Sequence, residues 1–239
     1  MEDRTRIGNE GFPSTAWTMV VQARRDDAGA QVAMERLCLS YWAPLYAFAR
    51  RSGWSREDAE DATQAFFAKM VEGAYLDRAR REKGRLRSFL LTCFKRYLGD
   101  ERDKARAQKR GGGKEVLSFD AGALEEVLAG DERDSSPELA FDRRWAHAVL
   151  ESTLGELEAE YRSKEKGELF AELSPFLMGA GEGYRDAASR LGMQENAVGV
   201  AVYRLRKRFA EGMRRQVLAT VETEDEVEAE LRHLMAALG

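Results

Sequence analysis

Residues 84–110 read GRLRSFLLTCFKRYLGDERDKARAQKR, and they join an apolar helical pattern to a basic one. In the first half, large apolar residues recur three or four positions apart, at Leu86, Phe89, Leu90, Cys93, Phe94 and Tyr97. After Leu98 the large apolar residues stop, but helix-favouring residues continue until the three glycines 111–113. The pattern predicts one helix whose front half packs into a core and whose back half is exposed.

The back half of this helix carries a row of cations. Lys95, Arg102, Arg106 and Lys109 are three, four or seven residues apart, which places them on one stripe. An ordinary solvated face is the alternative, but such a face usually mixes both signs in pairs one turn apart. Residues 78–110 instead hold thirteen Lys or Arg against four Asp or Glu. This excess beside aromatic residues favours contact with nucleic-acid phosphates and unstacked bases.

The composition predicts an all-α fold with one or two domains. The chain has 239 residues, of which 44% are hydrophobic and 33% charged, and only four are Pro. Strand-like alternation is nearly absent, and no stretch approaches the roughly 18 apolar residues of a membrane span. The first fifteen residues lack the apolar core of a secretory signal. Cys38 and Cys93 show no metal or redox spacing, so we expect free thiols in a cytoplasmic protein.

The charges are segregated along the chain. The net charge of −4 alone argues against nucleic-acid binding. However, residues 184–215 hold eight basic and three acidic residues, whereas residues 115–138 hold one basic and eight acidic residues. Two basic blocks separated by an acidic connector are typical of a nucleic-acid-binding protein whose net charge conceals its basic surfaces. We therefore expect two helical domains, 1–110 and 137–239, joined by an acidic linker over 111–136.

A helix with an acidic front is predicted after Ser55. The sequence Ser-Arg-Glu-Asp over 55–58 is a start of the capping-box type. Ala59, Ala62, Phe66 and Met70 give the helix a buried face, while Asp61 and Gln64 fall on a different, exposed face. An ordinary surface helix is the alternative interpretation of this pattern.

Residues 184–209 have the pattern of a helix-turn-helix. A short helix over 184–191 is followed by Gly192, and a longer basic helix begins near 195. Val198, Val202, Leu205 and Phe209 are expected to point inward. The outward stripe consists of Asn196, Val200, Tyr203 and Lys207, with Arg204 beside it. An ordinary helical hairpin is the alternative.

A last amphipathic helix is predicted over 223–238. Residues 222–230 contain six acids, and Val227, Leu231, Leu234 and Leu238 form an apolar side. An apolar stripe of this kind needs a cover. Either it packs on the helices of residues 136–178, or the acidic helix lies as a lid over the basic helix-turn-helix.

Nothing in the sequence has the pattern of a catalytic centre. The glycines 111–113 lack the remainder of a phosphate-binding loop. His147 and His233 lie far apart, and the acids show no spaced metal constellation. We therefore expect no enzyme activity, catalytic residue, metal or cofactor.

In this order, the blocks resemble the sigma factors of bacterial RNA polymerase, most closely the two-domain extracytoplasmic-function type. Residues 41–51 (YWAPLYAFARR), 57–70 (EDAEDATQAFFAKM) and 87–110 resemble the second region of that family, and residues 184–209 resemble its fourth region. Together with their flanks they cover most of residues 30–215. Neither block alone is decisive, but both in order across an acidic linker are quite specific.

The resemblance implies three binding surfaces on a sigma factor that recognises promoter DNA and assists strand opening. Core RNA polymerase would be contacted by Asp58, Asp61, Gln64 and Phe67. The minus-ten promoter element would be contacted by Lys95, Arg96, Tyr97, Arg102, Arg106, Lys109 and Arg110. The minus-thirty-five element would be contacted by Gln194, Glu195, Asn196, Val200, Tyr203, Arg204 and Lys207. The implied partners are core RNA polymerase and promoter DNA, with an anti-sigma protein as a further candidate.

A helix-turn-helix regulator with a helical sensor domain is the competing interpretation. Such a protein would bind promoter DNA without being a polymerase subunit. Residues 1–110 show no pattern of a ligand pocket, which disfavours a sensor domain. Co-purification with core polymerase distinguishes the two interpretations.

Overall fold

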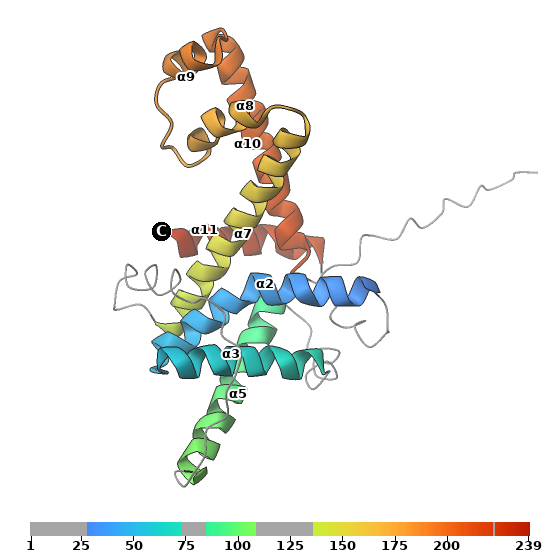
Figure 1. Cartoon of the computed structure of the whole chain (residues 1–239), viewed down its shortest axis with the longest axis vertical. Coiled ribbons are helices and arrows are strands. Elements are labelled where there is room, and N and C mark those ends of the chain that lie inside the picture. Colours follow the sequence, from blue (N-terminus) through green and yellow to red (C-terminus); the bar gives the residue numbers. More distant parts are fainter. Residues whose placement is uncertain (1–27, 73–84, 109–135, 222) are drawn as a thin grey trace, which may run out of the picture.

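The computed structural model describes residues 28–72, 85–108, 136–221 and 223–239, and the secondary structure in these ranges is helical without a strand. This confirms the predicted all-α fold. None of the described helices combines the length and apolar character that crossing a membrane requires. The elements, shown in Figure 1, are in order α2 (Ala28–Arg51), α3 (Arg56–Val71), α5 (Leu86–Gln108), α7 (Pro137–Ser163), α8 (Gly167–Leu173), η1 (Ser174–Leu177), α9 (Tyr184–Leu191), α10 (Glu195–Leu218), η2 (Glu224–Glu226) and α11 (Val227–Leu238).

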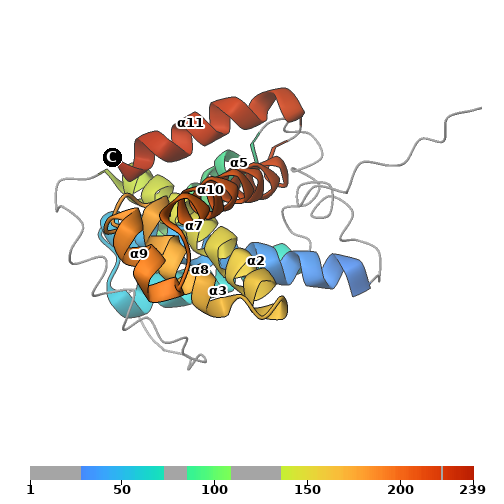
Figure 2. The same ribbon diagram turned by 90° about the horizontal axis from the view of Figure 1, so that it is seen from above.

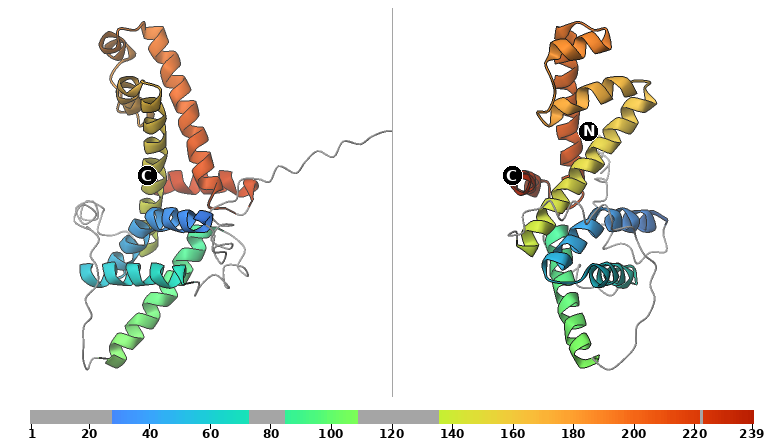
Figure 3. Two further views of the ribbon diagram at one scale, coloured as in Figure 1. Left: turned by 45° about the vertical axis from the view of Figure 1, so that its right-hand side comes forward. Right: turned by 60° about the vertical axis from the view of Figure 1, so that its left-hand side comes forward.

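The first hydrophobic core is built around α2, α3 and the front half of α5. Every apolar residue predicted for the buried face of α5 is buried, as are the four predicted for α3. Apolar side chains of α7, α10 and α11 join the same core, among them Phe141, Trp145, Val217 and Leu234. Burial of this face therefore decides the orientation of α5, whose back half extends beyond the other helices (Figures 1 and 3).

The second core holds the helix-turn-helix together. It contains Leu157 at the end of α7, Phe170 and Leu173 of α8, and Val202 and Leu205 of α10. The small residues Ala187 and Ala188 of α9 are buried here and allow α9 and α10 to approach closely. This core supports α9 and the first half of α10 at one end of the molecule (Figure 1).

Helices from both sides of the predicted linker share the first core. The expected unit 137–239 does not have one core of its own, because the front half of α7 and the end of α10 belong to the first core. The helices α7 and α10 run side by side from one core to the other (Figure 3). Most of the predicted acidic linker, 109–135, lies outside the described residues.

The C-terminal helix α11 lies against α7 and α10 in the first core, on their outer side in Figure 2. This is the packing alternative of the two considered above, and it places α11 away from the surface of the helix-turn-helix. Of the predicted apolar stripe, Val227 and Leu234 are buried, and Leu231 and Leu238 are half-buried against the first core.

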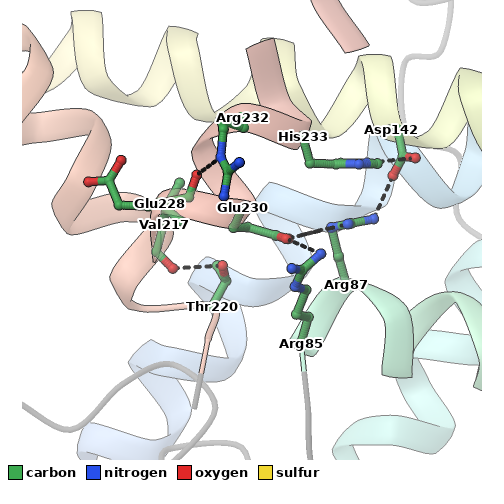
Figure 4. A network of polar contacts seen from close by, with 9 residues as sticks. All are labelled: Arg85, Arg87, Asp142, Val217, Thr220, Glu228, Glu230, Arg232 and His233. Atoms are coloured by element: carbon green, nitrogen blue, oxygen red, sulfur yellow. Dashed lines mark hydrogen bonds and ion pairs between the residues drawn. The ribbon is translucent and has the colours of Figure 1, made fainter. Parts of the chain in front are cut away.

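A polar network joins α11 to the beginning of α5 (Figure 4). The carboxylate of Glu230 is fully buried and accepts hydrogen bonds from Arg87, while a guanidinium nitrogen of Arg85 lies 3.0 Å from it. Arg87 also donates to Asp142 of α7 at 2.9 Å, and Asp142 lies 2.9 Å from the ring of His233. Carboxylates of α7 and α11 therefore meet at the buried side chain of Arg87 in α5.

The same region supplies a cap for α5. The backbone N–H of Leu86, the first residue of α5, donates to the carbonyl oxygen of Thr220 at 3.0 Å. The first N–H groups of a helix have no partner within the helix, so an acceptor from elsewhere stabilises the end. The junction between α10 and α11 thus holds the start of α5 through both backbone and side chains.

Candidate nucleic-acid interface

The turn of the predicted helix-turn-helix is present at Gly192. This residue has φ +62°, a left-handed conformation that glycine adopts without steric cost. The N–H of Met193 donates to the carbonyl of Ala188 at 2.9 Å, which closes the end of α9. Gln194, in extended backbone, then precedes the first turn of α10.

The first half of α10 separates an inward and an outward face. Val198, Val202 and Leu205 are buried. All seven residues predicted to contact DNA here are exposed: Gln194, Glu195, Asn196, Val200, Tyr203, Arg204 and Lys207. Val200 is 49% exposed and Tyr203 69%, so large apolar groups lie in water among polar side chains. The structure thus leaves the whole predicted set exposed, and Asn196, Val200, Tyr203 and Lys207 share one face of α10.

The cations of this region fall into two groups. Arg190 of α9 pairs with Glu172 and Glu182, and Arg206 donates to the carbonyl oxygen of Phe176, so these side chains bind their own domain. Arg204 and Lys207 take part in no ion pair or hydrogen bond among the described residues. The stripe therefore offers cations that are available to an external anion.

The predicted cations of α5 are differently placed. Lys95 donates to Glu138 of α7 at 2.6 Å, and its ammonium lies 5.4 Å from the centre of the Phe48 ring. The hydrogen bond from Lys95 lowers the pKa of the Glu138 carboxyl below its ordinary value of 4.5. Arg102 donates to the carbonyl of Ser52 and lies over the ring of Trp54 at 5.5 Å. Arg96 is exposed.

Tyr97 does not lie where base stacking requires it. It is 5% exposed and packs against Phe66 and Phe94, with ring centres 5.9 Å and 6.4 Å away, and Lys69 lies over its ring. Tyr97 is three residues from Phe94 and seven from Leu90, so it belongs to the buried face of the helix. Tyr97 is therefore part of the first core in this conformation, and its contact with the minus-ten element stays a prediction.

Phe67 is a second residue that the structure removes from a predicted surface. It is 6% exposed and contacts Phe66 edge to face at 5.8 Å. Apolar burial explains its position in α3, so it is not a surface contact for polymerase in this conformation. Asp61 and Gln64 are exposed as predicted.

Asp58 has a local structural role in addition to its predicted one. Its carboxylate accepts a hydrogen bond from the Ser55 hydroxyl at 2.7 Å, and its N–H donates to the same hydroxyl oxygen at 3.0 Å. Asp58 and Ser55 together cap the first turn of α3, as the sequence pattern predicted.

Three further predicted contacts carry no side-chain description. Arg106 lies within α5, but the structure does not describe its side chain, and Lys109 and Arg110 lie outside the described residues. The two predicted DNA surfaces are not brought together: α9 and α10 lie at one end of the molecule and the back of α5 at the other (Figure 1).

The sequence did not reveal the partners of the α5 cations. Glu138 and Ser52 lie 43 and 50 residues from the side chains that they bind. No local pattern connects residues so far apart. The described ranges contain no group of three or more His, Cys, Asp or Glu side chains that could hold a metal ion.

Comparison with known proteins identifies no relative. No protein-family model, curated protein or solved structure matches the chain. The function must therefore be inferred from the surfaces described above.

Proposed function

We propose that this protein is a sigma-type subunit of bacterial RNA polymerase, which binds core polymerase and promoter DNA and assists strand opening. The observation that carries the proposal is the exposed face of α10. It presents an amide, an aliphatic side chain, a phenol and two cations without partners among the described residues, on a helix fixed by a buried opposite face.

The side chains of this face suit the major groove. That groove is about 12 Å wide and admits an α-helix. Asn196 lies near the start of α10, from which an amide reaches base edges, and Val200 can contact a thymine methyl group. Arg204 and Lys207 supply charge for backbone phosphates, which fix the helix in register.

The α3 face is the proposed polymerase contact. Asp61 and Gln64 are exposed, and they lie one turn apart on a helix whose opposite side is buried in the first core. A polar face on a rigid helix can be complementary to a basic surface of a partner.

A charge reversal tests the polymerase contact. Asp61→Arg should lower the affinity for core RNA polymerase at least tenfold, because like charges across an interface cost several kcal/mol. The measurement is a titration of purified core polymerase, with circular dichroism to show that the variant is folded. Glu151→Arg, an exposed reversal on α7, is the matched control and should bind as the wild type does. Equal affinities of all three proteins would refute this docking surface.

A helix-turn-helix regulator that acts without polymerase is the second candidate. It is favoured by the α5 surface, where Lys95 and Arg102 are bound to their own chain and Tyr97 is buried. In this candidate α10 alone contacts DNA. Specific binding to promoter DNA together with no detectable binding to core polymerase would select it.

A further inference from the structure

A groove of about 180 Å³ lies between α10 and the corner where α7 meets α8. Its walls come from the adjoining ends of α7 and α8 and from α10, which is distant from them in sequence. The residues that line it are Glu160, Tyr161, Lys164, Lys166, Leu169, Ala201, Arg204 and Arg208. The groove therefore has an apolar part and a strongly cationic part.

The charge of the groove is almost entirely positive. Four of the lining residues are Lys or Arg, and Glu160 is the one carboxylate among them. Glu160 accepts hydrogen bonds from both Lys164 and Arg208, and the bond from Lys164 lowers the pKa of its carboxyl. Lys166 and Arg204 take part in no ion pair among the described residues. One carboxylate thus holds two cations in place, and two more remain available.

The corner that carries the lysines has a defined backbone. Glu165 has φ +58°, which is uncommon for a residue with a side chain. The N–H of Lys166 donates to the carbonyl oxygen of Tyr161 at 2.9 Å, and the Tyr161 ring packs against Phe170 at 5.5 Å. These contacts fix Lys164 and Lys166 on the side of the corner that faces α10.

The groove adjoins the predicted DNA stripe. Ala201, Arg204 and Arg208 are spaced three and four residues apart, so they form one ridge of α10. Each lies one residue after a member of the stripe, at Val200, Tyr203 and Lys207, and one residue is a turn of about 100°. A duplex whose major groove receives the stripe has one of its phosphate backbones beside this ridge.

We propose that the groove binds the phosphate backbone of the duplex that α10 contacts, with Lys164 and Lys166 extending the interface onto the α7–α8 corner. This proposal rests on the DNA-binding function proposed above. Cations held at fixed positions form charge-assisted hydrogen bonds with phosphate oxygens. Such contacts position a protein on DNA and carry no sequence information.

The salt dependence of duplex binding tests the groove. Lys166→Gln should make the negative slope of log K against log salt concentration shallower by about one, because each neutralised phosphate releases about one counterion. The loss should be equal for promoter and unrelated duplexes. Arg162→Gln is the matched control, since Arg162 is exposed near the same corner, pairs with Glu158 and does not line the groove. Its slope should equal that of the wild type.

A second variant removes the negative charge of the groove instead of a positive one. Glu160→Gln removes the one carboxylate from the groove and should raise duplex affinity severalfold, most at low salt, where screening is weakest. Circular dichroism shows whether each variant is folded. A folded Glu160→Gln protein that binds no better than the wild type contradicts a phosphate in the groove.

Failure of the groove can be separated from failure of the proposed function. If Lys207→Gln makes the salt dependence of duplex binding shallower and Lys166→Gln leaves it unchanged, then α10 binds DNA and the groove does not. If the wild type shows no salt-dependent binding to any duplex, the DNA-binding function itself is refuted, and the groove proposal with it.

Discussion

At the level of single residues, Gly212 determines how closely the two long helices approach. It is buried in α10, and a Cβ atom built on it would lie 2.7 Å from the Thr153 side chain of α7. Thr153 is itself fully buried, and its hydroxyl donates to the carbonyl of Val149 at 2.8 Å. Where α7 and α10 cross, there is therefore no room for a methyl group at position 212 unless one helix shifts.

We expect Gly212→Ala to lower the free energy of unfolding by about 1–3 kcal/mol, the usual cost of overpacking. The higher helix propensity of alanine, about 1 kcal/mol, opposes this effect. Denaturant unfolding measures the difference. Gly155→Ala is the matched control, because Gly155 is an exposed glycine inside α7 with no atom within 4 Å of its Cβ position. It should stabilise the protein, and an equal gain from Gly212→Ala would contradict a tight crossing.

Residue roles were predictable where spacing alone decides them. The buried face of α5 and the exposed stripe of α10 follow from a period of 3.6 residues, and the structure shows both. The same period places Tyr97 inside, although the family resemblance assigned it to DNA. The family resemblance gave Tyr97 a role in DNA binding, whereas packing against the first core determines that its side chain is buried.

At the level of elements, Glu230 links α11 to α5. Its carboxylate has no exposed surface, and its partners Arg85 and Arg87 lie more than 140 residues earlier in the chain. Arg87 is 8% exposed and also lies over the Trp145 ring at 5.5 Å. If the charge of Glu230 is removed, the buried guanidinium of Arg87 keeps Asp142 as its carboxylate partner.

We expect Glu230→Gln to lower the free energy of unfolding by about 3–5 kcal/mol, the typical cost of breaking a buried ion pair on one side. Chemical denaturation at neutral pH measures it. Glu228→Gln serves as the control: Glu228 lies on the same helix, is exposed and pairs with Arg214. An exposed pair contributes up to about 1 kcal/mol. If both variants lose the same small amount, Glu230 does not hold α11 to α5.

The positions of the helices were predictable, and the contacts between them were not. Capping and glycine signals placed the start of α3 and the turn at Gly192, because these signals act over a few residues. The pairing of Glu230 with Arg87 spans 143 residues and leaves no local signal. The sequence therefore indicated an amphipathic last helix without fixing what covers it.

At the level of the whole molecule, the first core holds the two halves of the chain together. α7 packs chiefly on α2, and its Phe141 ring lies 6.5 Å from that of Tyr41. Phe141 and Trp145 of α7 are at most 1% exposed. Charge segregation suggested two helical domains. Charge patterns describe surfaces, however, and do not indicate which apolar faces share a core.

This shared core predicts that the linker is not needed to keep the halves together. A protease recognition sequence inserted after Gly112 would allow the purified protein to be cut into residues 1–112 and 113–239. We expect the cut protein to elute as one species of unchanged size, because burial of the α2–α7 interface supplies the association. Phe141→Asp in the same cleavable chain is the control, since a carboxylate at a fully buried position in that interface is strongly unfavourable. Its pieces should separate after cleavage. Separation of the unsubstituted pieces would show that the shared core does not hold the two halves together.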